Sequence, residues 1–399
     1  MKLAIIGDRG IPAMYSGFST LTEQMAVRLV REYNFDVTVY CRRNYYSERP
    51  DHYHGVKCFY LPAPGGKNFE SIIHSNLSIF HAAFYGYDLV LVLDPGNGPF
   101  VVPLKLARTP VLLHTDGMGW KRKKWSPLQQ KYYKWSEKVS ALLADWLVTD
   151  SKAMQTYYEE EYGAKSTYIP YAGKIGDGLD ASILAQHGLT KNEYYLCVAR
   201  IEPDNNIDLI IREYRAAELS RPLVVVGAAR YDTEYGRAIA AENYGNVKCI
   251  GSVYEKNQLN TLFSSAWVYI HGHEVGGTNP SLLNAIYMSA APLALNVIFH
   301  RQVLGDGGLF FDAEPGALAA MLKDLDSDTD RVQQQRIYAK ARSDQYYRWD
   351  AVVDAYAKLA MAMVDQHADK SVADCVFDKE FYDPLPFYES NPVESSVPP

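Results

Sequence analysis

Residues 271–296 read HGHEVGGTNPSLLNAIYMSAAPLALN, and the order of apolar and turn-forming residues around this stretch indicates the fold. The apolar run at 267–271 predicts a buried strand that ends here, and residues 291–296 predict a second one. Between them, residues 281–288 have the composition of a helix. A strand, a turn, a helix and another strand predict a parallel sheet, and open α/β sheets bind ligands at the carboxyl ends of their strands.

The turn before this helix has the features of an anion-binding site. Thr278 or Asn279 suits the N-cap, and Pro280 suits the first helical position. The free N–H groups and the positive dipole end of the helix then face the turn, where Gly276 and Gly277 let a ligand approach the backbone. An ordinary capped strand-to-helix turn would contain the same residues, so this pattern alone leaves both interpretations open.

Composition limits the class of protein. With 399 residues, of which 48% are hydrophobic and 22% charged, the chain is long enough for two globular domains with large cores. The formal net charge of −7 argues against general nucleic-acid binding. The five cysteines show no CxxC spacing, which favours reduced thiols in a cytosolic protein.

The distribution of apolar residues predicts no membrane-spanning segment. No stretch reaches the roughly 18 consecutive apolar residues that a spanning helix needs. The apolar run at residues 3–6 is too short for a signal peptide, so we expect a cytoplasmic protein.

The first part of the chain alternates strands and helices. Strands are predicted at 3–7, 36–41, 55–61, 87–93, 110–114, 146–150 and 167–171, and helices at 19–32, 68–84, 129–143 and 151–162. This alternation requires a parallel sheet with right-handed crossovers. The first strand is followed by a glycine-bearing loop, residues 8–17, whose spacing is not GxGxxG and does not support a nicotinamide or flavin site.

The polar, glycine-rich segment GKIGDGLD, residues 173–180, is the best domain boundary. Beyond it the alternation of strands and helices resumes. Besides the strands at 267–271 and 291–296, strands are predicted at 194–199, 223–227, 247–251 and 310–311. One helix is predicted to end near residue 215, and others are predicted at 234–242, 257–265, 315–325 and 328–358. The predicted fold is α/β, with two Rossmann-like doubly wound domains facing across a cleft. We expect domains at 1–172 and 173–345, a helix at 346–367 that packs back toward the N-terminal domain, and a weakly ordered tail at 368–399.

A basic run lies between two tryptophans after the fifth predicted strand. It consists of Trp120, Lys121, Arg122, Lys123, Lys124 and Trp125. Cations beside amphipathic rings suit an anionic lipid surface or a diphosphate head group. A solvated helix start would look the same.

Four blocks together resemble the GT-B-type retaining glycosyltransferases of family four. The blocks are residues 7–18 (GDRGIPAMYSGF), 116–125 (DGMGWKRKKW), 198–211 (VARIEPDNNIDLII) and 271–285 (HGHEVGGTNPSLLNA). They are most similar to the bacterial rhamnosyltransferase-like branch of polysaccharide and O-antigen assembly. The likeness runs from residue 1 to about 360.

This resemblance implies a GT-B architecture and a reaction. A sugar would pass from a nucleotide diphosphate donor, held mainly by the C-terminal domain, to an acceptor hydroxyl bound mainly by the N-terminal acceptor-side domain. The anomeric configuration would be retained, and no metal or other cofactor would be needed. The implied acceptor is a glycan or a lipid-diphosphate-linked sugar at the inner face of the cytoplasmic membrane, which makes the protein a peripheral membrane protein.

The resemblance also assigns candidate site residues. The donor-binding candidates are Gly10, Gly17, Asn205, Asn206, Glu274, Gly276, Gly277, Thr278, Asn279 and Asn284. Departure of a nucleoside diphosphate develops negative charge, so Arg200, at the carboxyl end of a strand, is the best candidate for a charge-assisted phosphate contact. It would alternatively cap a helix or pair with Glu202. Asp116 is placed to orient the acceptor hydroxyl, and the basic run between the tryptophans is assigned to the acceptor or the membrane.

Several positions depart from the family pattern. The general family has a glutamate at Asn284, expected to bind both ribose hydroxyls, and a phosphate-binding lysine at Asn205. The branch commonly has glutamates where this chain has Ser19 and Gly119. Asparagine keeps one acceptor but loses the charge and bidentate geometry of a carboxylate. The departures favour a diverged member with an altered donor or acceptor, and Glu274 is a candidate for a compensating carboxylate.

Three hypotheses follow. The first is a transferase that uses dTDP-L-rhamnose, or another donor such as a UDP- or GDP-sugar, in bacterial surface polysaccharide synthesis. The second is a sugar-nucleotide epimerase with the same fold, which would consume donor without an acceptor and would not need the basic aromatic run. The third is a catalytically degenerate GT-B partner subunit, which the missing glutamates favour and the intact Arg200 disfavours.

Overall fold

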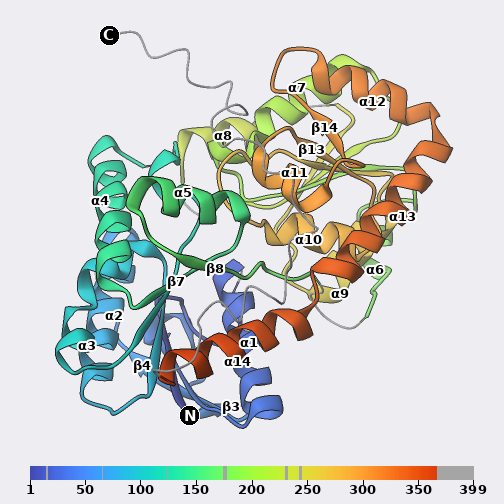
Figure 1. Cartoon of the computed structure of the whole chain (residues 1–399). Coiled ribbons are helices and arrows are strands. Elements are labelled where there is room, and N and C mark those ends of the chain that lie inside the picture. The colour runs from blue at the N-terminus through green and yellow to red at the C-terminus, as the bar shows by residue number, and fades with distance from the viewer. Residues whose placement is uncertain are drawn as a thin grey trace, which may run out of the picture. The chain divides into compact units, whose positions relative to one another are not determined.

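A computed structural model of the chain describes residues 1–14, 17–64, 66–123, 125–173, 178–229, 232–241 and 245–365. The chain divides into two compact units, each built on one sheet with helices packed against it (Figure 1). Among the described residues, unit 1 contains Met1–Lys121, Trp125–Tyr171 and residues 349–365. Unit 2 contains residues 122 and 123 and the segment Ala172–Arg348.

The sheet of unit 1 has eight strands in the order β3-β4-β2-β1-β5-β6-β7-β8. All neighbouring pairs are parallel except β3 with β4. The strands are β1 (Lys2–Ile6), β2 (Asp36–Arg42), β3 (His52–Tyr53), β4 (Val56–Leu61), β5 (Leu89–Leu93), β6 (Val111–His114), β7 (Trp146–Thr149) and β8 (Ser166–Tyr168). Because they are parallel, β1, β5, β6 and β7 deliver the loops that follow them to one edge of the sheet.

The helices of unit 1 connect these strands. They are α1 (Gly17–Tyr33), α2 (Gly66–Ala83), α3 (Val102–Leu106), α4 (Pro127–Leu143), α5 (Lys152–Tyr162) and α14 (Trp349–Val364), with short 3-10 helices η1 (Arg43–Tyr45), η2 (Pro95–Phe100) and η3 (Gly119–Lys121). Helix α4 begins with a capping box, in which Ser126 accepts from the backbone N–H of Gln129 and the Gln129 side chain accepts in return.

The sheet of unit 2 has six parallel strands in the order β11-β10-β9-β12-β13-β14. The strands are β9 (Tyr195–Val198), β10 (Leu223–Val226), β11 (Val247–Gly251), β12 (Val268–His271), β13 (Pro292–Leu295) and β14 (Leu309–Phe311). The helices are α6 (Ser182–Gln186), α7 (Ile207–Ala217), α8 (Glu234–Ala241), α9 (Lys256–Ser265), α10 (Pro280–Tyr287), α11 (Ile298–Leu304), α12 (Ala317–Ser327) and α13 (Thr329–Tyr346), with the 3-10 helix η4 (Pro203–Asn205).

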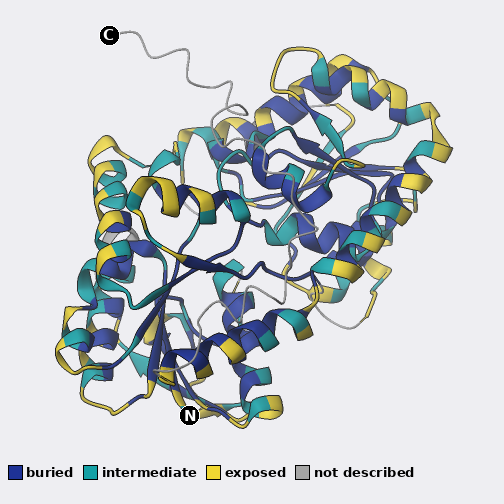
Figure 2. Cartoon of the chain, viewed as in Figure 1, coloured by how far each residue is buried: buried dark blue, intermediate teal, exposed yellow. Residues whose placement is uncertain are grey.

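The central strands form the cores of both units. All five residues of β5 (LVLVL) and all four of β10 (LVVV) and β13 (PLAL) are buried (Figure 2). Continuous apolar runs of this kind are typical of parallel strands covered by helices on both faces. The predicted α/β fold with two Rossmann-like domains is confirmed, and the central strands occur within one or two residues of their predicted positions.

The region predicted as helical at 328–358 is helical but divides into two helices. Helix α13 ends at Tyr346, the backbone of Tyr347 has φ −120° and ψ 54°, and a second helix, α14, begins at Trp349. Tyr347 and Trp349 are both buried, and no proline or glycine marks the break. Burial of two aromatic side chains therefore overrides helix propensity here. Helix α14 packs on α1, and Tyr33 Oη donates to Asp354 at 3.0 Å.

Strand β3 was not predicted. It pairs antiparallel with β4 through a two-residue turn, His54-Gly55, with φ values of +48° and +86°. Two consecutive positive φ angles match the twist of a tight hairpin, and glycine at the second position adopts its positive φ with little steric strain. The tail predicted to be weakly ordered, and residues 174–177 of the predicted boundary, lie outside the described residues.

Candidate functional site

Helix α10 and the turn before it lie at the carboxyl ends of the strands of the unit 2 sheet, and we call this edge of each sheet, with the loops that follow its strands, the rim of that unit. Asn279 is the N-cap, its side chain accepts from Ser281 N at 2.9 Å, and Pro280 occupies the first turn, as predicted. Gly276 has φ +155°, which an L-residue rarely adopts, while Gly277 and Thr278 are buried. The N-terminal end of α10, with the positive end of its helix dipole, thus faces the carboxyl end of β12.

Asn284 lies in the second turn of α10 and is fully buried. Neither Nδ2 nor Oδ1 of its side chain has a hydrogen-bond partner among the described residues. An unsatisfied buried amide costs roughly 1–3 kcal/mol, so such a group is uncommon without a ligand or an ordered water. An amide is both a donor and an acceptor, and it therefore suits a hydroxyl-bearing ligand.

The segment after β9 carries Arg200 and the paired asparagines. Asn205 Nδ2 donates to the carbonyl of Arg200 at 2.7 Å, and Asn206 Nδ2 donates to the carbonyl of Gly272 at 2.9 Å. The asparagines therefore join the loop after β9 to the loop after β12. The Arg200 guanidinium lies 3.4 Å from Glu202, which is the predicted alternative for this residue, yet about a third of its side chain (34%) stays exposed and accessible to an anion.

Glu274 is held by residues of the same unit. Its backbone N–H donates to the Asp204 carbonyl at 2.9 Å, and its carboxylate pairs with Lys123 Nζ at 2.7 Å. The backbone N–H of Lys123 donates to the Asp204 carboxylate at 2.7 Å. Two predicted site residues, Lys123 and Glu274, are thus brought together by charge.

Three histidines behind this rim were missed by the sequence analysis. The rings of His271 and His273 stack at 4.4 Å, and the ring of His300 meets His271 edge-on at 4.6 Å. Burial holds the pKa of His271 and His273 well below the usual range and lowers that of His300 to about 4, so all three are neutral. His271 Nε2 and His273 Nδ1 are buried without partners among the described residues. The HGH spacing was the only available signal, because His300 is far away in the sequence.

These histidines do not constitute a metal site. Tyr269 Oη lies 2.8 Å from His271 Nδ1, and His300 Nδ1 lies 2.8 Å from the Leu295 carbonyl. Across the described ranges, no group of three His, Cys, Asp or Glu side chains is arranged to hold a metal ion.

In unit 1, the glycine-bearing loop after β1 packs closely on β2. Gly10 has φ +119°, and a Cβ atom there would lie 2.6 Å from Cys41 Sγ, so local packing already requires this glycine. Gly17 is the first residue of α1, and Tyr15 and Ser16 lie outside the described residues. The loop is followed by Ser19, whose Oγ donates to the Asp8 carboxylate at 2.9 Å.

Asp8, in unit 1, was also missed as a candidate site residue. It is buried, and burial raises its pKa, while hydrogen bonds from the backbone at Arg9 and from Ser19 oppose that rise. The carboxylate that the family pattern leads one to expect at Ser19 is absent, but a buried carboxyl group from Asp8 lies against that side chain.

Asp116 lies just after β6, where its carboxylate accepts from Gly117 N at 2.9 Å. Near it, the buried ring of His114 packs against Phe18 at 5.3 Å and Tyr171 at 5.8 Å. Burial lowers the pKa of His114 to about 4. At the rim of unit 1, the Asp116 carboxylate therefore lies near the neutral rings of His114, Phe18 and Tyr171.

The basic run is largely engaged within the protein. Trp120 Nε1 donates to Tyr157 Oη at 3.3 Å, and the ammonium groups of Lys121 and Lys134 lie over the Trp120 ring at 5.3 and 4.9 Å. Trp125 stacks on Tyr133 at 5.5 Å. A Cβ at Gly119 would approach the Tyr133 ring to 3.3 Å, so the side chain missing here would crowd that stack.

The remaining residues of the run are Arg122 and Lys124. Arg122 is half-buried and belongs with unit 2. Lys124 lies outside the described residues. In the parts of the chain that the structure describes, none of the helices combines the length and apolar character needed to cross a bilayer.

Comparison with known families divides the chain in the same way as its two units. Residues 1–174 match the family model described as "Domain of unknown function (DUF1972)", and residues 181–343 match "Glycosyl transferases group 1". No curated protein sequence matches the chain.

Several solved structures share the fold at low sequence identity. A sucrose-phosphate synthase from Thermosynechococcus elongatus is 18% identical, with a TM-score of 0.78 and coverage of 92% of this chain and 99% of that one. Anabaena HepE in complex with UDP-glucose is 15% identical, with a TM-score of 0.67 and coverage of 90% and 98%. An E. coli trehalose-6-phosphate protein bound with UDP-2-fluoro glucose is 9% identical, with a TM-score of 0.68 and coverage of 90% and 99%. The GT-B architecture is thereby confirmed, since these neighbours are GT-B glycosyltransferases.

Proposed function

We propose that this chain, whose residues 181–343 form a group 1 glycosyltransferase domain, transfers a sugar from a nucleotide diphosphate donor to an acceptor hydroxyl. Unit 2 would bind the donor and unit 1 the acceptor. The observation that carries the proposal is the capped N-terminus of α10, with the unsatisfied amide of Asn284 in the second turn of the same helix.

The proposed donor contacts follow from charge. As the bond from sugar to phosphate breaks, negative charge develops on the leaving diphosphate, and fixed donors that strengthen at this stage accelerate the step. The Arg200 guanidinium, in a side chain about a third of which is exposed, is such a donor, and the positive dipole end of α10 would stabilise the same charge. The Asn284 amide, which no described protein group satisfies, would bind a ribose hydroxyl in place of the family's glutamate.

We infer a retaining reaction without a metal ion. The acceptor hydroxyl would attack the face of the sugar that the diphosphate leaves, and a donor phosphate oxygen would take its proton. Asp116 would orient that hydroxyl through its carboxylate. Asp8, missed by the sequence analysis, adds a buried carboxyl group to the same rim of unit 1.

Our first candidate donor is dTDP-L-rhamnose, with a glycan or lipid-linked acceptor of surface polysaccharide synthesis. A UDP-sugar is the second candidate, supported by the similar folds that were solved with UDP-glucose and UDP-2-fluoro glucose. A GDP-sugar is the third. A degenerate partner subunit is the non-enzymatic alternative.

Nucleotide binding is the direct test. Thermal shift and calorimetry of the full chain with dTDP, UDP, GDP and their sugar conjugates should show one conjugate that raises the melting temperature, since a ligand specific to the native state stabilises it. The selected nucleotide identifies the donor class. Failure of every nucleotide to bind would contradict the transferase proposal and favour the partner subunit. Turnover of the selected donor without any acceptor would instead support an epimerase.

We further propose that the protein is cytoplasmic and associates peripherally with the membrane, and the outer face of α4 supports the membrane association. Leu128, Trp135 and Leu142 are 78%, 53% and 71% exposed, and Lys131 and Lys138 are exposed between them. The spacing of three and four residues places all five on one side of the helix. The only carboxylate of α4, Glu137, is buried on the other side.

Such a face suits an anionic bilayer, where apolar side chains enter the interface and lysines remain at the head groups. The full chain should co-sediment with phosphatidylglycerol vesicles and lose most of this binding in the variant K131E/K138E, because each lysine near such a surface contributes about 1 kcal/mol. Equal binding to neutral phosphatidylcholine vesicles, or unchanged binding of the variant, would contradict this surface. The exposed pair K165E/K323E is the matched control.

A further inference from the structure

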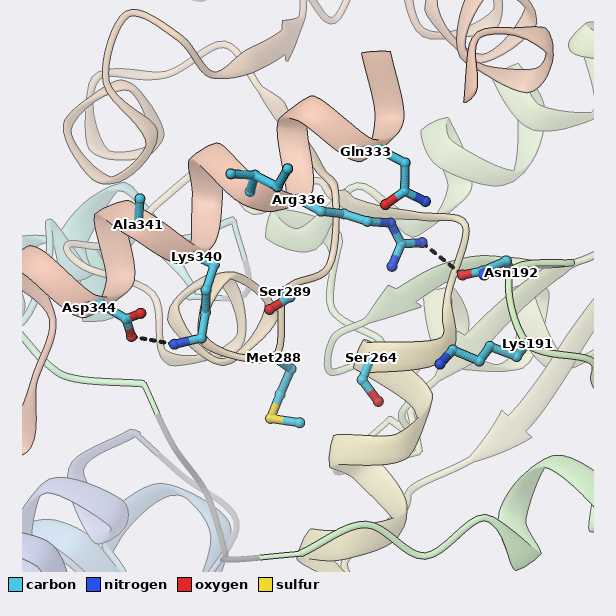
Figure 3. A pocket seen from close by; sticks show the side chains of 11 residues that line it. Lys191, Asn192, Ser264, Met288, Ser289, Gln333, Arg336, Lys340, Ala341 and Asp344 are labelled. Atoms are coloured by element: carbon cyan, nitrogen blue, oxygen red, sulfur yellow. Dashed lines mark hydrogen bonds and ion pairs between the residues drawn. The ribbon is translucent and has the colours of Figure 1, made fainter. Parts of the chain in front are cut away.

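A cavity with a volume of about 740 Å³ lies in unit 2 (Figure 3). Helix α13 forms one wall, and the opposite wall comes from the chain just before β9, β12 and β13, at Asn192, Ser264 and Ser289. These strands are parallel, so the cavity is at their amino ends. The rim formed by α10 and the loop after β12 is at their carboxyl ends, so the two sites are separate.

The cavity contains a buried arginine without a countercharge. Arg336, on α13, is only 9% exposed. Its Nη2 donates to Asn192 Oδ1 at 3.1 Å, to the Trp267 carbonyl at 3.1 Å and to the Ala266 carbonyl. Its Nε is buried without a partner, and within the described ranges no carboxylate forms an ion pair with its guanidinium. Carbonyls supply dipoles but no net charge, so this cation is left uncompensated.

The other charged side chains make the cavity more positive. Lys191 is exposed at its edge and makes no ion pair with a described carboxylate. Lys340 pairs with Asp344, the only carboxylate in the lining, and lies 5.0 Å from the centre of the Tyr287 ring. Three cations against one carboxylate leave a net charge of +2 in a chain whose formal net charge is −7.

Uncharged polar groups complete the lining. Ser264, Ser289 and Gln333 face the same space from three different segments (Figure 3). Hydroxyl and amide groups of this kind bind ligand hydroxyls, while the guanidinium supplies paired donors for an oxyanion. The volume is within the range of small-molecule sites.

We propose that this cavity is a binding site for a small polyhydroxylated molecule that carries a phosphate or carboxylate group, such as a sugar phosphate. The anionic group lies against Arg336 and Lys191, and the hydroxyls lie against the serines and Gln333. The site does not overlap the proposed donor site and does not depend on the proposed reaction. It adjoins the C-terminal end of α10, where Met288 and Ser289 follow the helix whose N-terminus belongs to the donor site.

Calorimetry with the full chain tests this site. We expect glucose 6-phosphate or gluconate to bind, glucose itself not to bind, and binding to persist when a nucleotide diphosphate is present in excess. A preference between the two anions identifies phosphate or carboxylate as the recognised group. Displacement of both anions by the nucleotide diphosphate would overturn the proposal, because it would place them in the donor site. Equal binding of glucose would overturn it as well.

Two variants keep the test independent of folding. The exposed Lys191 contributes nothing to the core, so K191E should fold normally and weaken anion binding about tenfold, as expected for a charge reversal near a surface. R336Q keeps a donor for the Ala266 and Trp267 carbonyls and should abolish binding. The control K323E reverses an equally exposed lysine elsewhere in unit 2 and should leave affinity unchanged. Wild-type affinity in K191E would refute the site even if R336Q failed to fold.

Discussion

The two sheets present different rims at their carboxyl ends. In unit 1, two buried polar side chains near this edge are paired, Ser19 with Asp8 at 2.9 Å and Asn97 Nδ2 with the Leu93 carbonyl at 2.7 Å. In unit 2, the Asn284 amide and His271 Nε2 are buried without partners among the described residues.

This difference indicates which rim is complete by itself. A paired rim is stabilised by its own hydrogen bonds, whereas an unpaired rim keeps donors and acceptors available for a ligand at a cost in stability. Unit 1 has exceptions, among them Arg42 Nε and both ring nitrogens of His114, which have no partner among the described residues. The neutral ring of His114 is enclosed by Phe18 and Tyr171, so its environment favours packing.

The largest effect is expected for Arg200→Ala in unit 2. Removal of one donor that stabilises developing charge typically lowers kcat by about 10²–10³. The fold should persist, because the Arg200 side chain is partly exposed. Steady-state kinetics with the donor identified by the nucleotide screen would measure it. Arg237→Ala, which removes an exposed arginine 3.5 Å from Asp232, is the matched control and should retain wild-type kcat. A normal rate for Arg200→Ala would remove Arg200 from the reaction.

Asn284→Leu should change stability and binding in opposite directions. Leucine has nearly the same shape as asparagine and eliminates an unsatisfied buried amide, so the ligand-free protein should become more stable by roughly 1–2 kcal/mol. The nucleotide sugar should raise the melting temperature of this variant less than that of the wild type, because the variant lacks the amide that would bind the ligand. Urea unfolding with and without nucleotide checks both. A less stable ligand-free variant would show that Asn284 is satisfied in solution and would remove the contrast between the rims.

Ser19→Ala should have the smallest effect and the opposite sign. It deletes the hydroxyl that donates to the buried Asp8, so the free energy of unfolding should fall by about 1 kcal/mol at neutral pH. The loss should be smaller at acidic pH, because a neutral carboxyl group needs the donor less than an ionised one. Since burial raises the pKa of Asp8 from 3.8, this decline should begin above that value. A stabilised variant would mean that the unit 1 rim, too, leaves its polar groups unsatisfied.

Local patterns in the sequence predicted most elements of the fold. The continuous apolar runs at 89–93, 223–226 and 292–295 could be strands of a parallel sheet, and each is one. The N-cap of α10 was predicted at Thr278 or Asn279, and it is Asn279, because capping depends on the chemistry of a few adjacent positions. No proline or glycine marks the break at Tyr347, which accompanies burial of the Tyr347 and Trp349 side chains.

The candidate site was predictable only in part. Asn205 and Asn206 were identified, but their bonds to Arg200 and Gly272 depend on how two loops meet. The stacked histidines and the proximity of Asp8 to Ser19 involve residues far apart in the sequence or on separate elements.

The sequence by itself determined the α/β class, the alternation of elements and the capped turn before α10, because periodicity, capping and turn chemistry act over a few residues. Only the tertiary structure decided which polar groups are satisfied. It buried Asn284 with no partner in the described part of the chain and brought Asp8 to Ser19. It also placed Arg336 in a cavity where no described carboxylate pairs with it. The physical reason is that burial and charge pairing depend on distances across the fold, and no local pattern in the chain encodes them.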